Sequence, residues 1–230
     1  MLYAIGDLHL SLAVDKPMDV FGGAWEGYLG KIEQGLSNLT ADDTLILAGD
    51  TSWGMSLQDA LADFQFLERF PCKKVLLKGN HDYFWDTAAK MNRFFAEHGL
   101  LTFDILHNNA FFIDGFAVCG TRGWFFEEER GGEHDTKMIN REAGRLRASL
   151  EAGRKLGGEL TAFLHYPPLY EGYRCEPLVE VLEEYGVKRC FFGHLHGRAC
   201  ARAIEGLYRG IGYRLISADH VGFTPVRVAG

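Results

Sequence analysis

The residues best suited to chemistry in this sequence fall into five short groups, each directly after an apolar run. The groups read Gly6-Asp7-Leu8-His9, Gly49-Asp50, Gly79-Asn80-His81-Asp82, His165 and Gly193-His194-Leu195-His196. Imidazole nitrogens combined with carboxylate oxygens, without thiolate, suit borderline divalent ions such as Mn, Fe or Zn and are too rich in nitrogen for Ca or Mg. The potential metal ligands are Asp7, His9, Asp50, Asn80, His165, His194 and His196.

These ligands are more numerous than one ion with an open catalytic position would use. Two divalent transition-metal ions that share a carboxylate fit the set. Two aspartates and a bridging hydroxide would leave the pair of ions with a net positive charge, which would attract an anion such as a phosphoester. Asp7 and His9 are spaced i, i+2, as are His194 and His196. In extended backbone this spacing points both side chains to one side.

Short strand-like runs alternate with segments of helical period along the chain. Strands are expected at Leu2–Ile5, Thr44–Ala48, Lys74–Leu77, Ala110–Ile113, Phe116–Cys119, Leu160–Leu164 and Arg189–Phe192. Helices are expected at Trp25–Leu39, Ser56–Phe70, Thr87–His98, Asp135–Leu156 and Pro177–Tyr185. This alternation predicts an α/β fold with a largely parallel sheet. Near the end of the chain, Tyr213–Ser217 and Phe223–Val228 are expected to form a closing hairpin.

All five polar groups stand where an expected strand ends. Ligands of open α/β sheets bind beyond the carboxyl ends of the strands, so the five endings should meet in one place. Each motif alone is common as a turn or a buried histidine. Their joint occurrence, in this order, favours a functional site over a structural role.

Together the five groups resemble the signature of the calcineurin-like metallophosphoesterase superfamily, from Asp7 to His196. The resemblance implies a single domain over residues 1–230 with two packed mixed β-sheets flanked by helices, an α/β/β/α sandwich. It implies that one metal is bound by Asp7, His9, Asp50 and His196. It implies that a second metal, bridged by Asp50, is held also by Asn80, His165 and His194. His81 is then the catalytic residue, which stays off the metals, contacts the phosphate and protonates the leaving group.

One position departs from the pattern of the protein phosphatases in this superfamily. They carry an aspartate three residues after the bridging aspartate, which hydrogen-bonds the general-acid histidine, whereas this sequence has Trp53 there. Asp82, adjacent to His81, is a candidate partner in its place. The Arg-rich signatures of those phosphatases are also missing, so the resemblance extends to fold and chemistry but not to substrate.

Several further residues are candidates for substrate contact. Arg122 follows an expected strand and could bind a phosphate oxygen as a fork, with a structural role as the alternative. Aromatic residues near the polar groups could form a wall around a substrate or pack against the metal shell. They are Trp53, Tyr83, Trp85, Trp124 and Tyr166. The most irregular stretch, Phe125–Asp135, is expected to be a mobile loop.

The amino-acid composition limits the partners and the cellular location that can be expected. The chain has 230 residues, 47% hydrophobic and 24% charged, with a net charge of −7 and no cluster of Lys and Arg, so nucleic acid is not expected as a partner. Five cysteines without a Cys-x-x-Cys pair and no signal-peptide or membrane-span pattern predict a cytoplasmic protein that does not use a membrane.

The expected activity is hydrolysis of a phosphomonoester or phosphodiester by a metal-bridging hydroxide, with a small phosphoester as substrate. The alternatives are a catalytically idle scaffold that binds a protein partner, and a nuclease. No particular oligomeric state is indicated.

Overall fold

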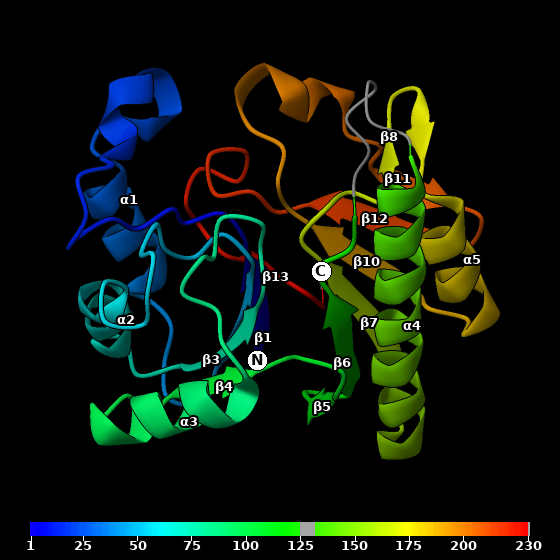
Figure 1. Cartoon of the computed structure of the whole chain (residues 1–230), viewed down its shortest axis with the longest axis horizontal. Coiled ribbons are helices and arrows are strands. Elements are labelled where there is room, and N and C mark those ends of the chain that lie inside the picture. The colour runs from blue at the N-terminus through cyan, green and yellow to red at the C-terminus, as the bar shows by residue number, and fades with distance from the viewer. Residues whose placement is uncertain (125–131, 230) are drawn as a thin grey trace.

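A computed structural model describes residues 1–124 and 132–229. Two β-sheets pack face to face, with helices α1, α2 and α3 on the outer face of one and α4 and α5 on the outer face of the other (Figure 1). This is the predicted α/β/β/α sandwich of two mixed sheets. Most of the predicted mobile loop, residues 125–131, lies outside the described residues. Its last residues belong instead to α4, which begins at Glu133.

The first sheet has five strands in the order β13-β1-β2-β3-β4. Strands β1 to β4 are parallel and β13 pairs antiparallel with β1. Helices on one face connect the parallel strands in turn. The bounds are β1 Leu2–Ile5, α1 Tyr28–Leu36, β2 Thr44–Ala48, α2 Leu61–Glu68, β3 Lys73–Leu77, α3 Ala88–Glu97, β4 Phe103–Ile105 and β13 Val226–Arg227.

The second sheet has six strands in the order β11-β12-β10-β7-β6-β5. Its four central strands are parallel, and β11 and β5 are antiparallel at the two edges. The bounds are β5 Phe111–Ile113, β6 Phe116–Thr121, α4 Glu133–Leu156, β7 Glu159–Leu164, α5 Glu176–Glu184, β10 Arg189–Phe192, β11 Gly206–Tyr208 and β12 Ile211–Leu215. A separate short hairpin joins β8 Leu169–Tyr170 and β9 Tyr173–Arg174.

The central strands are apolar throughout because both of their faces are covered. Alternate side chains of β2 show this. Leu45 and Leu47 pack in the core beneath α1, α2 and α3, whereas Ile46 and Ala48 pack between the two sheets. The rings of Phe163 and Phe191 stack in that same central layer, with centroids 5.2 Å apart. The two sheets are therefore held together by apolar contacts, which fix the relative positions of their strand ends.

Two predicted helices are shorter than expected. The pattern predicted a helix from Trp25 to Leu39, but α1 begins only at Tyr28, because Gly27 has a φ of +64° and interrupts the chain there. Trp25 lies instead in a short 3₁₀ helix, Gly23–Trp25. The predicted helix Ser56–Phe70 is reduced to α2, after a turn region over residues 56–60.

The predicted C-terminal hairpin is wrong. β12 joins the second sheet beside β10, whereas β13 joins the first sheet beside β1. The intervening chain crosses over the ends of both sheets: the amide of Ile216 donates to Phe192, and the amide of Ala218 donates to Gly6. These long-range bonds prevent the chain from turning back on itself. The crossing places Asp219 next to the polar groups at the strand ends.

Candidate metal centre

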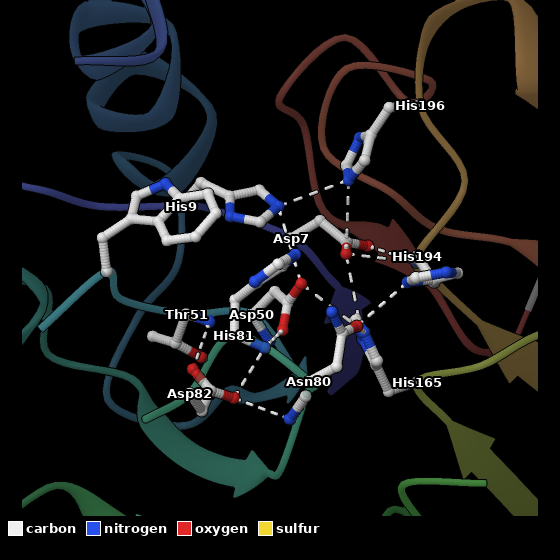
Figure 2. A network of polar contacts seen from close by, with 12 residues as sticks. Asp7, His9, Asp50, Thr51, Asn80, His81, Asp82, His165, His194 and His196 are labelled. Atoms are coloured by element: carbon white, nitrogen blue, oxygen red, sulfur yellow. Dashed lines mark hydrogen bonds and ion pairs between the residues drawn. The ribbon is translucent and has the colours of Figure 1, made fainter. Parts of the chain in front are cut away.

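The polar groups that follow β1, β2, β3, β7 and β10 meet at one place, as the strand endings predicted (Figure 2). Their side chains form two groups of potential metal ligands. In each group one ligand atom per residue lies within 4.8 Å of the others. Group one is Asp7, His9 and His196, and group two is Asp50, His165 and His194.

Group one is drawn from both sheets. His196 Nε2 lies 3.5 Å from Asp7 Oδ1 and 3.3 Å from His9 Nε2. Asp7 is fully buried, and both of its oxygens accept from the backbone N–H of His194, at 2.9 and 3.1 Å. The carboxylate of Asp7, which follows β1, therefore also holds the start of the loop that follows β10. This contact connects the ends of the two strands.

Asn80, a predicted ligand, lies against two residues of group two. Asn80 Oδ1 lies 2.6 Å from His165 Nε2 and 3.0 Å from His194 Nδ1. Asp50 Oδ2 lies 3.5 Å from His165 Nε2 and 3.7 Å from His9 Nε2. This oxygen therefore stands between a histidine of group two and a histidine of group one. An oxygen in this position could serve as a ligand to an ion at either group.

The backbone of these residues corrects one part of the prediction. Asp7, His9, Asp50 and His194 all have positive φ, at 60°, 48°, 50° and 73°, so neither i, i+2 pair is in extended backbone. His194 and His196 accordingly belong to different groups. Left-handed backbone costs about 1–2 kcal/mol for a residue with a side chain. Such strain is concentrated at functional sites, where surrounding bonds hold it in place.

Two histidines are oriented through their other ring nitrogen. Nδ1–H of His165 donates to the carbonyl of Ala48 at 3.2 Å, which leaves Nε2 facing Asp50 and Asn80. Nδ1–H of His196 donates to Asp219 Oδ1 at 2.9 Å, which leaves Nε2 facing Asp7. A second partner of this kind fixes the ring and its tautomer in metal-binding histidines. Sequence reasoning missed Asp219, because it placed this residue in a hairpin turn.

The pKa values of the histidines determine which rings are in the neutral form that binds metal. Burial lowers the pKa of His9 and of His194 to about 3, so both rings are neutral at pH 7. Burial acts against the charge of His196 as well. Its hydrogen bonds to Asp219 and Asp7 outweigh burial and raise its pKa to about 10. A neutral imidazole binds metal, so an ion at group one must displace the proton of His196.

The pKa values of the two carboxyl groups, Asp50 and Asp7, are shifted in opposite directions. Burial and the neighbouring charge of Asp7 raise the pKa of Asp50 to about 8. Burial also acts to raise the pKa of Asp7. The hydrogen bond to His196 and the charges of the surrounding histidines hold it below its ordinary value. Two buried carboxylates in one site resist ionising together unless positive charge accompanies them. Together with the nitrogen-rich donor set, this requirement for positive charge fits divalent ions.

Asp82 supports the site but does not face His81. Its buried carboxylate accepts from the backbone N–H groups of Asp50, Thr51 and Gly79, at 3.0, 2.8 and 2.7 Å. These bonds join the ends of β2 and β3. The close approach also requires glycine at position 79, because a Cβ there would collide with the Asp50 carboxylate. Asp82 is thus a positioning residue for Asp50.

Comparison with known proteins agrees with this arrangement. Residues 2–198 match the calcineurin-like phosphoesterase family. The chain belongs to that family. No curated protein matches the chain significantly.

Solved structures show the same fold at low sequence identity. The protein of unknown function AQ665 from Aquifex aeolicus is 17% identical, with a TM-score of 0.51 over 98% of this chain and 94% of that one. The protein TT1561 of Thermus thermophilus is 14% identical, with a TM-score of 0.51 over 85% of this chain and 81% of that one. At this identity the likeness establishes the fold alone.

His81 of this member of the calcineurin-like phosphoesterase family lies beside the potential metal ligands. Its backbone N–H donates to Asp50 Oδ1 at 2.7 Å, and its ring is half-buried. His81 Nδ1 lies 3.2 Å from the Tyr83 hydroxyl, and its ring centroid lies 4.5 Å from that of Trp53. Trp53 also stacks on His9, with centroids 4.9 Å apart. Where the protein phosphatases place an aspartate, this chain therefore holds its histidine between an indole and a tyrosine.

The other aromatic candidates divide between the site and the core. Tyr166 packs on the rings of His165 and His194. Trp124 Nε1 donates to Asp135 at 3.1 Å, and Trp85 packs with the core beneath the helices of the first sheet. Trp25, which the sequence analysis did not select, lies 5.6 Å from the ring of His196.

Arg122 lies beside Glu142 and Trp124, and its predicted phosphate contact stays a prediction. Its guanidinium lies 3.9 Å from the buried carboxylate of Glu142 and over the ring of Trp124. It lines a small separate hollow with Lys78 and Arg145. The Arg122 carbonyl accepts from the backbone N–H groups of His165 and Tyr166. Arg122 therefore acts on the site through its backbone, which holds the end of β7.

Proposed function

We propose that this protein is a dinuclear metal-dependent phosphohydrolase that cleaves a small phosphomonoester or phosphodiester. The observation that carries the proposal is the pair of ligand groups with Asp50 Oδ2 between them. A pocket opens directly onto these residues, with His9, Asp50, His81, His194 and His196 in its lining. A phosphate group in the pocket would meet the potential metal ligands and His81 together.

Each ion has a defined set of protein ligands in this proposal. Asp7, His9, Asp50 and His196 would hold one ion. Asp50, Asn80, His165 and His194 would hold the other. Bound there, the two ions would supply an activated water and the positive charge that phosphoester hydrolysis needs. The mixture of imidazole and carboxylate favours Mn, Fe or Zn.

His81 is the proposed general acid. It is the histidine of the pocket that falls outside both ligand groups. Burial, together with the charges of His165 and Lys16, lowers the pKa of His81 in the free protein. An anionic phosphate against the ring favours its protonated form. The bound substrate itself would thus prepare His81 to protonate the departing oxygen.

The alternatives are less well supported by the described residues. An idle scaffold needs neither a set of potential metal ligands nor His81 in the pocket, so the presence of these residues favours an enzyme. A nuclease needs a basic surface for the phosphate backbone, which a net charge of −7 does not favour. Among the helices of residues 1–124 and 132–229, none combines the length and apolar character of a membrane span. All five cysteines are free, and we propose a reducing cytoplasm as the location.

A substrate screen tests the proposed function. Protein loaded with Mn is assayed against bis-p-nitrophenyl phosphate and p-nitrophenyl phosphate. We expect hydrolysis of at least one ester, and its loss in Asp50→Asn. If protein shown to contain two ions per chain hydrolyses neither ester nor any of a panel of nucleotides and phospholipid headgroups, the scaffold explanation replaces the enzymatic one.

A further inference from the structure

The pocket above the candidate metal centre has a volume of about 590 Å³, far more than a phosphate group needs. Pockets of about 300–1,000 Å³ hold organic ligands of drug size. Its floor is formed by the potential metal ligands and His81. Its walls are built by Met18, Phe21, Trp25 and Trp53, together with the backbone of residues 22–24. The walls therefore face the organic part of a substrate whose phosphate lies on the floor.

The wall side chains are almost without hydrogen-bonding capacity. Met18 and Phe21 have no donor, and the indole N–H of Trp53 donates to Met18 Sδ at 3.4 Å. The indole N–H of Trp25 is the remaining side-chain donor among these four residues. The carboxylate of Asp219, at the edge of the pocket, accepts from His196 and from the backbone of Gly197. A nucleoside or sugar would leave most of its polar groups unmatched against these walls, at a cost for each group buried. The walls fit an apolar group.

The apolar surface continues out of the pocket. Phe21 lines the pocket and is nevertheless 71% exposed, and its neighbour Val20 is 73% exposed. Both lie in the 3₁₀ helix Met18–Phe21, and Met18 at its start is buried. A row of apolar side chains thus leads from the buried Met18 and Trp25 to the solvent. Such a row would contact an extended chain along its length, whereas a compact ring would fill only the inner part.

We propose that the site takes amphiphilic phosphoesters, with the phosphate at the metal centre and an alkyl or acyl chain lying along Met18, Trp53 and Phe21. This inference rests on the proposed phosphohydrolase function and names its substrate class. Transfer of methylene groups from water into the pocket would tighten binding roughly 2–4-fold for each group. The gain would end when the chain extends beyond Phe21.

Binding of alkyl phosphonates tests the substrate class without relying on catalysis. Their P–C bond cannot be hydrolysed, and ethyl, butyl, hexyl and octyl phosphonate differ only in chain length. Calorimetric titration of the Mn-loaded protein is expected to show affinity rising about 2–4-fold per methylene. 6-Hydroxyhexyl phosphonate should bind more weakly than hexyl phosphonate. Equal affinities along the series would overturn the inference.

Matched variants locate the chain in the pocket. Phe21→Ser should reduce the dependence of affinity on chain length, with the largest loss on octyl phosphonate and the smallest on ethyl phosphonate. Phe112→Ser, at an exposed phenylalanine of β5 in the other sheet, should leave the whole series unchanged. If the two variants behave alike, the chain does not lie along Phe21 and the inference fails.

Two further arms separate the possible outcomes. Co-sedimentation with phosphatidylcholine vesicles, with and without phosphatidic acid, distinguishes a bilayer lipid from a free amphiphile. Association that requires phosphatidic acid supports a lipid substrate. A chain-length dependence in solution without such association supports a free amphiphile. If the protein hydrolyses p-nitrophenyl esters but binds all the phosphonates with equal affinity, the amphiphilic substrate class is refuted and the phosphohydrolase function stands. Failure to hydrolyse any ester with two ions bound refutes the proposed function itself.

Discussion

Asp219 should control one metal site and not the other. Its Oδ1 accepts from His196 Nδ1 and its Oδ2 accepts from the Gly197 amide, both at 2.9 Å. In Asp219→Asn only one oxygen remains, so the new amide NH₂ must face one of these two donors. His196 would then lose its hydrogen bond to a charged acceptor, or the loop at Gly197 would lose the backbone bond that holds His196 in place. Loss of such a partner typically weakens metal binding about 10–100-fold.

The loss should be confined to the ion held with Asp7 and His9. Titration of metal-free protein against a competing fluorescent chelator resolves two affinities. We expect the one that includes His196 to weaken by about 10–100-fold and the other to stay near its wild-type value. Glu205→Gln is the matched control, because Glu205 also pairs with a histidine, His220 at 3.5 Å, away from both ligand groups. The control should bind both ions normally.

Two results would refute this reasoning about Asp219. If Asp219→Asn weakens both ions equally, the carboxylate acts on the whole centre and not through the His196 ring. If it weakens neither, His196 is held in place by its other surroundings, such as the ring of Trp25. Thermal unfolding of the metal-free variant checks that the fold is retained.

The remaining predictions concern the other residues of the site. Asp50→Asn should weaken the binding of both ions, because it removes the charge shared by the two groups, whereas His196→Ala should weaken the binding of mainly one ion. If chelator titration shows the same losses of affinity in the two variants, Asp50 is not shared between the ions. His81→Ala should lose about 10²–10⁴-fold in rate on alkyl esters, which need a proton on the leaving oxygen, and distinctly less on p-nitrophenyl esters. Its metal content should be unchanged, and equal losses on both esters would remove the general-acid role. Asp82→Asn should lower the free energy of unfolding of the metal-free protein by about 1–3 kcal/mol, because an amide with one oxygen cannot accept from all the backbone N–H groups that the carboxylate serves. Urea denaturation should show no such loss for Asp104→Asn, on the exposed side of β4.

The potential metal ligands could be predicted from sequence because each stands within four residues of an apolar strand end. An apolar strand is a local signal, and parallel strands end at a common edge, so local patterns were sufficient to bring distant residues together. The helical period over Asp135–Leu156 is likewise a local signal, and α4 spans Glu133–Leu156.

The supporting residues depended on contacts that local patterns do not contain. Asp219 reaches His196 only because the chain between β12 and β13 crosses from one sheet to the other. Phe21 and Trp25 reach the pocket through a segment of two short 3₁₀ helices interrupted by glycines with positive φ. Such a segment shows no hydrophobic periodicity from which its structure could be predicted. The side-chain directions of Asp7 and His194 were misread because their left-handed backbone is held by tertiary hydrogen bonds.

The metal content of active protein tests the central claim most directly. Metal-free protein is reconstituted with Mn, freed of loosely bound ions, and measured by elemental analysis alongside its rate on a phosphoester. The arrangement of Asp50 between the two ligand groups predicts two ions per chain, with activity appearing only as the second ion binds. Full activity with a single tightly held ion would contradict the dinuclear site.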